Sequence, residues 1–283
     1  MMGKEIVRKP IASGQFYPDN FTQLDEFITT CFTGSKGPAA VSSRGIEDVQ
    51  GILVPHDKYA FSGPTCAWGY AELAKTEAPQ TVIILAPALS GSTTCISNQD
   101  FETPFGRVAC DVPLAKAMIE QGIPLNNYQH GVEHQIEVQI PFVQYVYRKH
   151  LNKLKLIPLL IGDQDPEEII EKLRGALEQE PRRVKWIIST NLTHYGPGYH
   201  YLPFELDVEQ KLEELDRTMI SLINTPQKLL EYVHENSVQW FGLNSILIAK
   251  AFLGEAQLVH YTNTGKILGE WKNVVSYAAL KFV

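Results

Sequence analysis

Short apolar runs alternate with longer amphipathic stretches along most of the chain. The runs are rich in β-branched residues and are bounded by Gly or Pro, a pattern typical of buried strands. The amphipathic stretches repeat apolar residues every three or four positions, as helices with one buried face do. The pattern predicts strands at residues 51–55, 81–87, 154–161, 184–190, 257–261 and 274–282, and its clearest helices at 65–75, 166–178 and 208–223.

The order of these elements indicates the class of fold. Residues 51–87 read as strand, helix and strand, and such βαβ units build parallel sheets with helices on both faces. Asp165 is a suitable N-cap for the helix that follows it. We therefore predict a single α/β domain over residues 1–283, with a mainly parallel central sheet flanked by helices.

Composition narrows the range of partners. The 283 residues are 44% hydrophobic and 20% charged, which is typical of a soluble globular protein. The formal net charge is −7 and the sequence has no dense Lys/Arg cluster, so nucleic acid is not an expected partner. No apolar run approaches the roughly 20 residues that a membrane-spanning helix needs. The four cysteines are widely spaced and the first residues lack an apolar core, so we expect reduced thiols in a cytoplasmic protein.

Two predicted strands lead into a histidine. His56 follows residues 51–55 directly, and His194 follows residues 184–190, with Gly196 and Pro197 turning the chain soon afterwards. Ligand sites in open α/β sheets form outside the carboxyl ends of the strands. We therefore expect His56 and His194 at the same edge of the sheet, within roughly 10 Å of each other, the scale of a small-molecule pocket. The alternative is that each histidine only caps its strand.

Residues 132–142 combine polar and titratable groups with an apolar stripe. If a helix begins there, His134 and Glu137 lie three residues apart on one face and can contact each other or a common ligand. A Glu–His pair that only stabilises the first helical turn is the other interpretation.

The sequence has no phosphate-binding glycine motif and no G-x-S-x-G nucleophile motif. Ser62 or Ser90 would therefore need, to act as a nucleophile, a base that the sequence does not specify.

Five motifs, spread from about residue 10 to the C-terminus, resemble those of the Memo family, which includes the B component of the bacterial AmmeMemoRadiSam system. The family's fold is similar to that of the class III extradiol ring-cleavage dioxygenases, which carry non-haem iron. The resemblance implies one pocket formed by His56, His134 and His194, with Tyr59 in its wall and Phe16 or Tyr17 at its rim. The motifs are residues 12–18, 54–63, 133–142, 192–196 and 275–279.

The chain departs from the family at its metal ligands. Of the three ligand positions only His56 is kept, since Leu89 stands in place of a histidine and Gln239 in place of a cysteine. Leucine has no donor atom, and glutamine is a weak neutral donor beside a thiolate. Asn191 replaces an aspartate of the family, and Asp57, next to His56 in an extended segment, is expected to point to the opposite side. We therefore expect no tightly bound metal and no cofactor.

These features favour a binding or scaffold protein that keeps the pocket but lacks dioxygenase activity. Its partners would be a small-molecule ligand and the proteins of an AmmeMemoRadiSam-type system. The alternative is an enzyme with a rebuilt site, metal-dependent or hydrolase-like. There, His194 would act as general base with His134 and Asn191, or His56, Asp57, His134, His194 and Glu137 would offer new metal ligands. A third interpretation is a structural partner protein whose histidines only pack.

Overall fold

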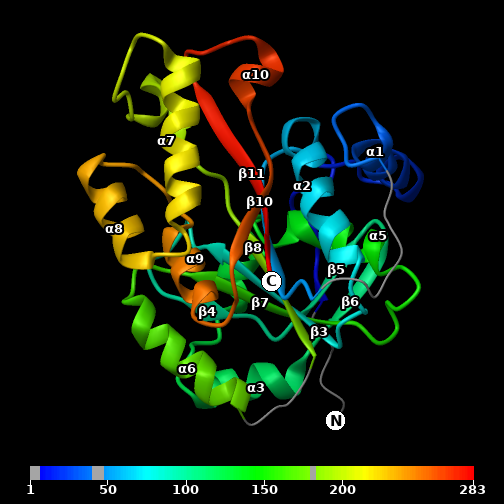
Figure 1. Cartoon of the computed structure of the whole chain (residues 1–283). Helices are drawn as coiled ribbons and strands as arrows, with labels where there is room; N and C mark the ends of the chain where they lie inside the picture. Colours follow the sequence, from blue (N-terminus) through cyan, green and yellow to red (C-terminus); the bar gives the residue numbers. More distant parts are fainter. Residues whose placement is uncertain (1–6, 40–47, 179–182) are drawn as a thin grey trace.

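The computed structural model describes residues 7–39, 48–178 and 183–283, and a central sheet runs through them (Figure 1). Its strands are β1 (Val7–Arg8), β2 (Gly51–Val54), β3 (Thr81–Pro87), β4 (Cys95–Ile96), β5 (Asp100–Thr103), β6 (Gly106–Cys110), β7 (Lys155–Ile161), β8 (Val184–Ser189), β9 (His194–Tyr195), β10 (Ala256–Asn263) and β11 (Val274–Phe282). The helices are α1 (Phe21–Thr33), α2 (Tyr59–Ala74), α3 (Val112–Glu120), α4 (Asn127–Val132), α5 (Ile140–Val146), α6 (Pro166–Glu178), α7 (Val208–Leu222), α8 (Pro226–Glu235), α9 (Leu243–Lys250) and α10 (Thr264–Leu268), with 3₁₀ turns η1 (Glu137–Gln139) and η2 (Pro197–Tyr199).

The sheet is mixed but mostly parallel. Along its main path the described strands follow the order β1-β5-β6-β7-β3-β8-β2-β11-β10, while β4 pairs with β7 and β9 with β11. The central strands β7, β3, β8 and β2 are parallel neighbours, so their carboxyl ends lie at one edge. Strands β11 and β10 extend the sheet in antiparallel fashion. The prediction of a single α/β domain with a mainly parallel sheet is confirmed.

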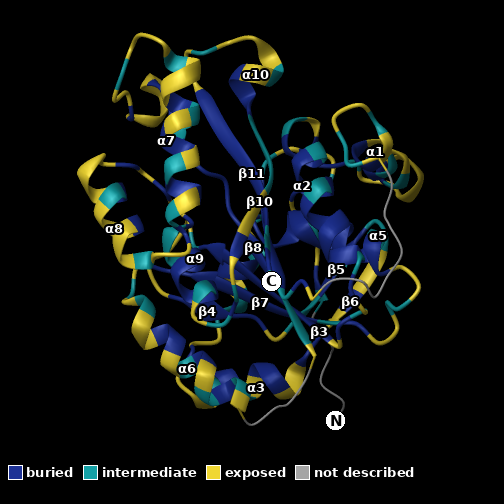
Figure 2. Ribbon diagram, viewed as in Figure 1, coloured by how far each residue is buried: buried dark blue, intermediate teal, exposed yellow. Residues whose placement is uncertain are grey.

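Helices cover both faces of this sheet and create two hydrophobic cores (Figures 1 and 2). Successive strand residues point to opposite faces. In β2, for example, Leu53 belongs to the core beneath α3, α6, α7, α8 and α9, whereas Ile52 and Val54 belong to the core beneath α1, α2 and α5. Strands buried on both faces read as continuous apolar runs, which is why the sequence pattern located them well.

Helix α2 differs most from its predicted form. The sequence pattern predicts a start at residue 65, but the helix begins at Tyr59 and passes through Pro64. A proline inside a helix removes one backbone hydrogen bond. Here Cys66, Ala67 and Tyr70 pack the helix into the core, and that burial outweighs the loss.

Other expectations from composition agree with the structure. The four cysteines are buried and unpaired, as expected for reduced thiols. Within the described ranges, no helix is both long and apolar enough to cross a lipid bilayer.

Candidate functional site

The parallel strands β2 and β8 bring the two predicted histidines to the same edge of the sheet. The strands are paired so that Val54 lies opposite Ser189, and both chains then continue past the sheet edge. His56 lies just beyond β2, and His194 begins the short strand β9, where it pairs with Val275 of β11. The predicted common edge is confirmed.

Hydrogen bonds hold His56 at this edge. Its backbone N–H donates to Oδ1 of Asn191 at 3.0 Å, and its Nδ1 lies 3.0 Å from the carbonyl oxygen of Ser189. Because a carbonyl only accepts, Nδ1 carries the proton and Nε2 is left as an acceptor. Burial, with smaller contributions from His134 and His194, lowers the pKa of His56 to about 3. The imidazole is therefore neutral at pH 7.

His134 joins His56 from the turn between α4 and η1. Its ring centroid lies 6.4 Å from that of His56, with the rings nearly perpendicular. On its other side the ring of Phe16 lies 4.2 Å away. Burial lowers the pKa of His134, although the carboxylates of Glu137, Glu133 and Asp57 oppose that shift.

His194 lies among aromatic rings. Tyr199 and Phe241 approach it edge-on, with ring centroids at 5.1 Å and 5.8 Å. Its Nδ1 is buried and has no hydrogen-bond partner of good geometry among the described residues, although the Leu192 carbonyl lies near enough to raise its pKa. Burial is the larger effect and lowers that pKa.

Asp57 supplies the charge of the site. Its Oδ2 accepts a hydrogen bond of 2.6 Å from the hydroxyl of Tyr277, and its charge raises the pKa values of His134 and His194. Asp57 therefore does not point away from the site, contrary to our expectation. The chain turns at this residue into α2, with Oδ1 accepting from the backbone N–H of Lys58, so strand-like alternation does not apply. We call His56, Asp57, His134 and His194 the histidine cluster.

Glu137 lies outside the histidine cluster and pairs with Arg8. Both side chains are fully buried in this ion pair. The oxygens of Glu137 also accept from the backbone N–H groups of Ile11 and Ala12, each at 2.9 Å, and from the Tyr17 hydroxyl at 2.6 Å. His134 precedes η1, and the carboxylate of Glu137 binds the N-terminal segment. Its charge still raises the pKa of His134, so the two residues interact electrostatically.

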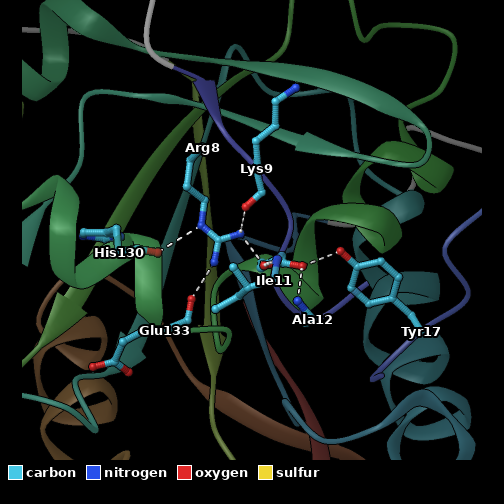
Figure 3. A network of polar contacts seen from close by, with 8 residues as sticks. Arg8, Lys9, Ile11, Ala12, Tyr17, His130 and Glu133 are labelled. Atoms are coloured by element: carbon cyan, nitrogen blue, oxygen red, sulfur yellow. Dashed lines mark hydrogen bonds and ion pairs between the residues drawn. The ribbon is translucent and has the colours of Figure 1, made fainter. Parts of the chain in front are cut away.

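Arg8 ties that N-terminal segment to the turn carrying His134 (Figure 3). Its Nε donates to the carbonyl oxygen of His130 at 2.9 Å, and its Nη2 donates to that of Glu133 at 2.7 Å. Its guanidinium also lies over the ring of Phe101, 5.1 Å from the centroid. Through Arg8, the chain that presents Phe16 is thus fixed against the chain that presents His134.

The remaining predicted residues lie around the cluster or apart from it. Phe16 is half-buried against His134, but Tyr17 is buried and donates its hydroxyl hydrogen bond to Glu137 rather than forming a rim. Tyr59 is also buried, and its hydroxyl donates to the Val138 carbonyl at 2.6 Å. Tyr59 belongs to the core and to a separate cavity between α1 and α2.

The positions of the family's other two metal ligands are exposed. Leu89, 51% exposed, follows β3 and donates its backbone N–H to Glu133, while Gln239 lies on the surface between α8 and α9. Asn191 is buried and holds the backbone of His56. In the described part of the chain, no group of three His, Cys, Asp or Glu side chains is arranged to hold a metal ion. These residues do not fit the metal site that the resemblance implies.

Three contributors escaped the sequence analysis. Tyr277 lies in the motif at residues 275–279, but the strand pattern does not separate it from a core residue of β11. Phe241 lies in a loop without a motif. Arg8 lies in a strand of two residues, too short to show a period. Tyr199 belongs to an aromatic loop that the sequence does reveal, but its contact with His194 depends on the fold.

Comparison with known proteins agrees with the fold. Residues 8–281 match a family model described as Memo-like protein. The chain is 30% identical to a MEMO1 family protein of Methanopyrus kandleri, covering 97% of this chain and 98% of that protein. It is 31% identical to one of Methanococcoides burtonii, covering 97% and 99% respectively. A solved structure, that of uncharacterized protein JW3007 from Escherichia coli K12, covers 83% of this chain and all of that one, with a TM-score of 0.50 and 13% identity, which indicates a shared fold.

Because the Arg8–Glu137 ion pair is buried, two similar Glu→Gln substitutions should change the free energy of unfolding by very different amounts. Glu137→Gln leaves the buried Arg8 without its counter-charge, so we expect the free energy of unfolding to fall by about 3–5 kcal/mol. Glu171→Gln removes an exposed partner of Arg174, and we expect a loss of about 0–1 kcal/mol. Urea denaturation of both variants measures the difference, and equal losses would contradict the structural role of the Arg8 pair.

The low pKa of His56 predicts a pH dependence of stability. The histidine has a pKa near 6.5 in the unfolded chain but about 3 in the folded one, so between these values only the unfolded state takes up the proton. Acidification from about pH 6.5 to pH 4 should therefore reduce the free energy of unfolding, by about 1.4 kcal/mol per pH unit for this residue. Urea titrations at several pH values should give a shallower dependence in His56→Gln, and an unchanged one in the exposed His234→Gln. An identical slope in His56→Gln would refute the assignment.

Proposed function

The chain belongs to the Memo-like protein family, and from that premise we propose that it is a binding protein whose histidine cluster holds a small molecule. One observation carries the proposal. Three imidazoles with lowered pKa values, from three separate segments, lie together near Asp57 at the carboxyl edge of the sheet. Convergent polar groups at that edge are typical of ligand sites in α/β folds.

The chemistry of the cluster narrows the ligand. A neutral imidazole offers one donor and one acceptor, and Asp57 offers acceptors. Arg8, the buried cation behind His134, already pairs with Glu137 and is not available to an anion. The rings of Phe16, Tyr199 and Phe241 supply flat apolar walls. The site suits an uncharged small molecule with a flat body and hydrogen-bond donors.

We propose further that the metal site of the family is lost in this chain. A non-haem iron or zinc site needs about three protein ligands in a fixed geometry. His56 is the one ligand kept, while Leu89 has no donor atom and Gln239 is exposed. The function proposed here therefore includes no dioxygenase activity.

An enzyme with a rebuilt site is the second candidate, and the surroundings of His194 favour it. The imidazole of this histidine would take a proton from the substrate, and the charge of Asp57 would stabilise the imidazolium that forms. Such a site would support a hydrolase-like reaction, with His134 and Asn191 placing the reactants. Turnover of the bound ligand would distinguish this function from binding alone.

The cellular setting is part of the same proposal. We place the protein in the cytoplasm, where its four unpaired cysteines would stay reduced. Its protein partners would be those of an AmmeMemoRadiSam-type system, a role suggested by the family resemblance. Affinity capture with the purified chain, followed by identification of the retained proteins, tests that association.

Ligand binding at the cluster predicts a clear effect of two substitutions. In a thermal-shift screen of small uncharged fragments, some should raise the Tm of the natural protein, since a ligand that binds only the folded state stabilises it. His56→Ala combined with His194→Ala should abolish those shifts, and His234→Ala, on the exposed side of α8, should preserve them. Shifts that persist in the double variant would place binding elsewhere.

Restoring the family's ligands should create metal affinity. In isothermal titration with Zn²⁺ or Fe²⁺, the natural protein should show no tight binding, whereas Leu89→His with Gln239→Cys should bind one ion per chain. The matched pair Leu89→Ala with Gln239→Ser controls for the loss of the natural side chains. Stoichiometric metal in the natural protein, lost on His56→Ala, would refute the proposal and favour the rebuilt enzyme.

A further inference from the structure

A cavity lies between α1 and the start of α2, which pack side by side (Figure 1). Its volume is about 450 Å³, within the range of small-molecule sites. Its lining includes Pro18, Phe27, Tyr59 and Pro64, and the ring centroids of Phe27 and Tyr59 lie 6.4 Å apart. The cavity therefore offers mainly flat, apolar surface to an occupant.

The charge of this cavity comes from α1. Glu26 is the one charged residue in its lining, and it has no ion-pair partner among the described residues. Gln23 and Thr30 lie on the same face of α1, since residues three and four apart are neighbours on a helix. The face of Phe27 also attracts cations. A molecule with an apolar body and a protonated amine complements both features.

The cavity and the histidine cluster are built by the same two segments. One segment places Phe16 against His134 and Pro18 in the cavity. The other places Asp57 in the cluster and Tyr59 in the cavity wall. The backbone N–H of Tyr59 donates to the carbonyl of Phe16 at 2.9 Å and joins the two segments. An occupant that displaces the backbone of Tyr59 would therefore also move Phe16, through this hydrogen bond.

We infer that the cavity between α1 and α2 binds a small aromatic or aliphatic amine, and that its occupancy alters the surroundings of His134. Glu26 would pair with the ammonium group at the cavity mouth, while the apolar body would lie against Phe27, Ala60 and Pro64. The inference goes beyond the proposed function, because it does not depend on what the histidine cluster binds.

Three probes of similar shape test the inference: 2-phenylethylamine, 2-phenylethanol and 3-phenylpropanoate. Titrations followed by NMR should give the lowest Kd for the amine and the highest for the carboxylate. Glu26→Gln should raise the Kd of the amine about two- to fivefold, the usual worth of an exposed ion pair, and leave that of the alcohol unchanged. Glu167→Gln, an exposed acid on α6, should change neither.

The effect of cavity occupancy on His134 can be measured separately. The imidazole signals of His134 should shift as the amine binds, and Ala60→Phe, which fills the cavity, should abolish both binding and shift while thermal denaturation shows that the variant is folded. His56→Ala with His194→Ala should leave amine binding intact, which separates this inference from the proposed function. Equal affinity for the three probes, amine binding that survives Ala60→Phe, or unmoved His134 signals during binding would overturn it.

Discussion

The buried ion pair between Arg8 and Glu137 is the constraint on which the site depends. Two charges in the core are costly to desolvate, and the pair is tolerable only when every remaining polar atom is satisfied. The backbone N–H groups of Ile11 and Ala12 and the Tyr17 hydroxyl satisfy the carboxylate, and backbone carbonyls of the turn after α4 satisfy the guanidinium. Segments about 130 residues apart are thereby held in one arrangement.

This arrangement explains the electrostatics of the histidine cluster. Glu137 neutralises the charge of Arg8, the buried cation near the cluster. Burial therefore changes the pKa values of the histidines more than any neighbouring charge does. Burial disfavours the imidazolium form, and the pKa values of His56, His134 and His194 all fall. Asp57 opposes the effect at two of them without reversing it. The site is therefore a set of neutral donors and acceptors around one carboxylate, rather than a positively charged pocket.

The sequence predicts the sheet much better than the site. Strands buried on both faces carry their own local signal, and β3 and β11 begin and end where the apolar runs do. His56 and His194 were found because each follows such a strand. The partner of Glu137 could not be found in this way, because Arg8 is 129 residues away and a long-range ion pair leaves no local pattern in the sequence. The sequence also did not predict the direction of the Asp57 side chain. That direction depends on the turn into α2, and Pro64 inside the helix makes its early start hard to recognise from the sequence.

The contacts that support the cluster also show what sets its shape. Asn191 holds the backbone of His56, and Gln139 donates to both the Pro55 carbonyl and the Ser189 hydroxyl, at 2.8 and 2.9 Å. None of these contacts, nor the Arg8 pair, uses an atom that a metal would need. A site whose geometry came from the metal itself would lose its shape with its ligands. Here hydrogen bonds and an ion pair set the shape, so the geometry of the site does not depend on a metal ion.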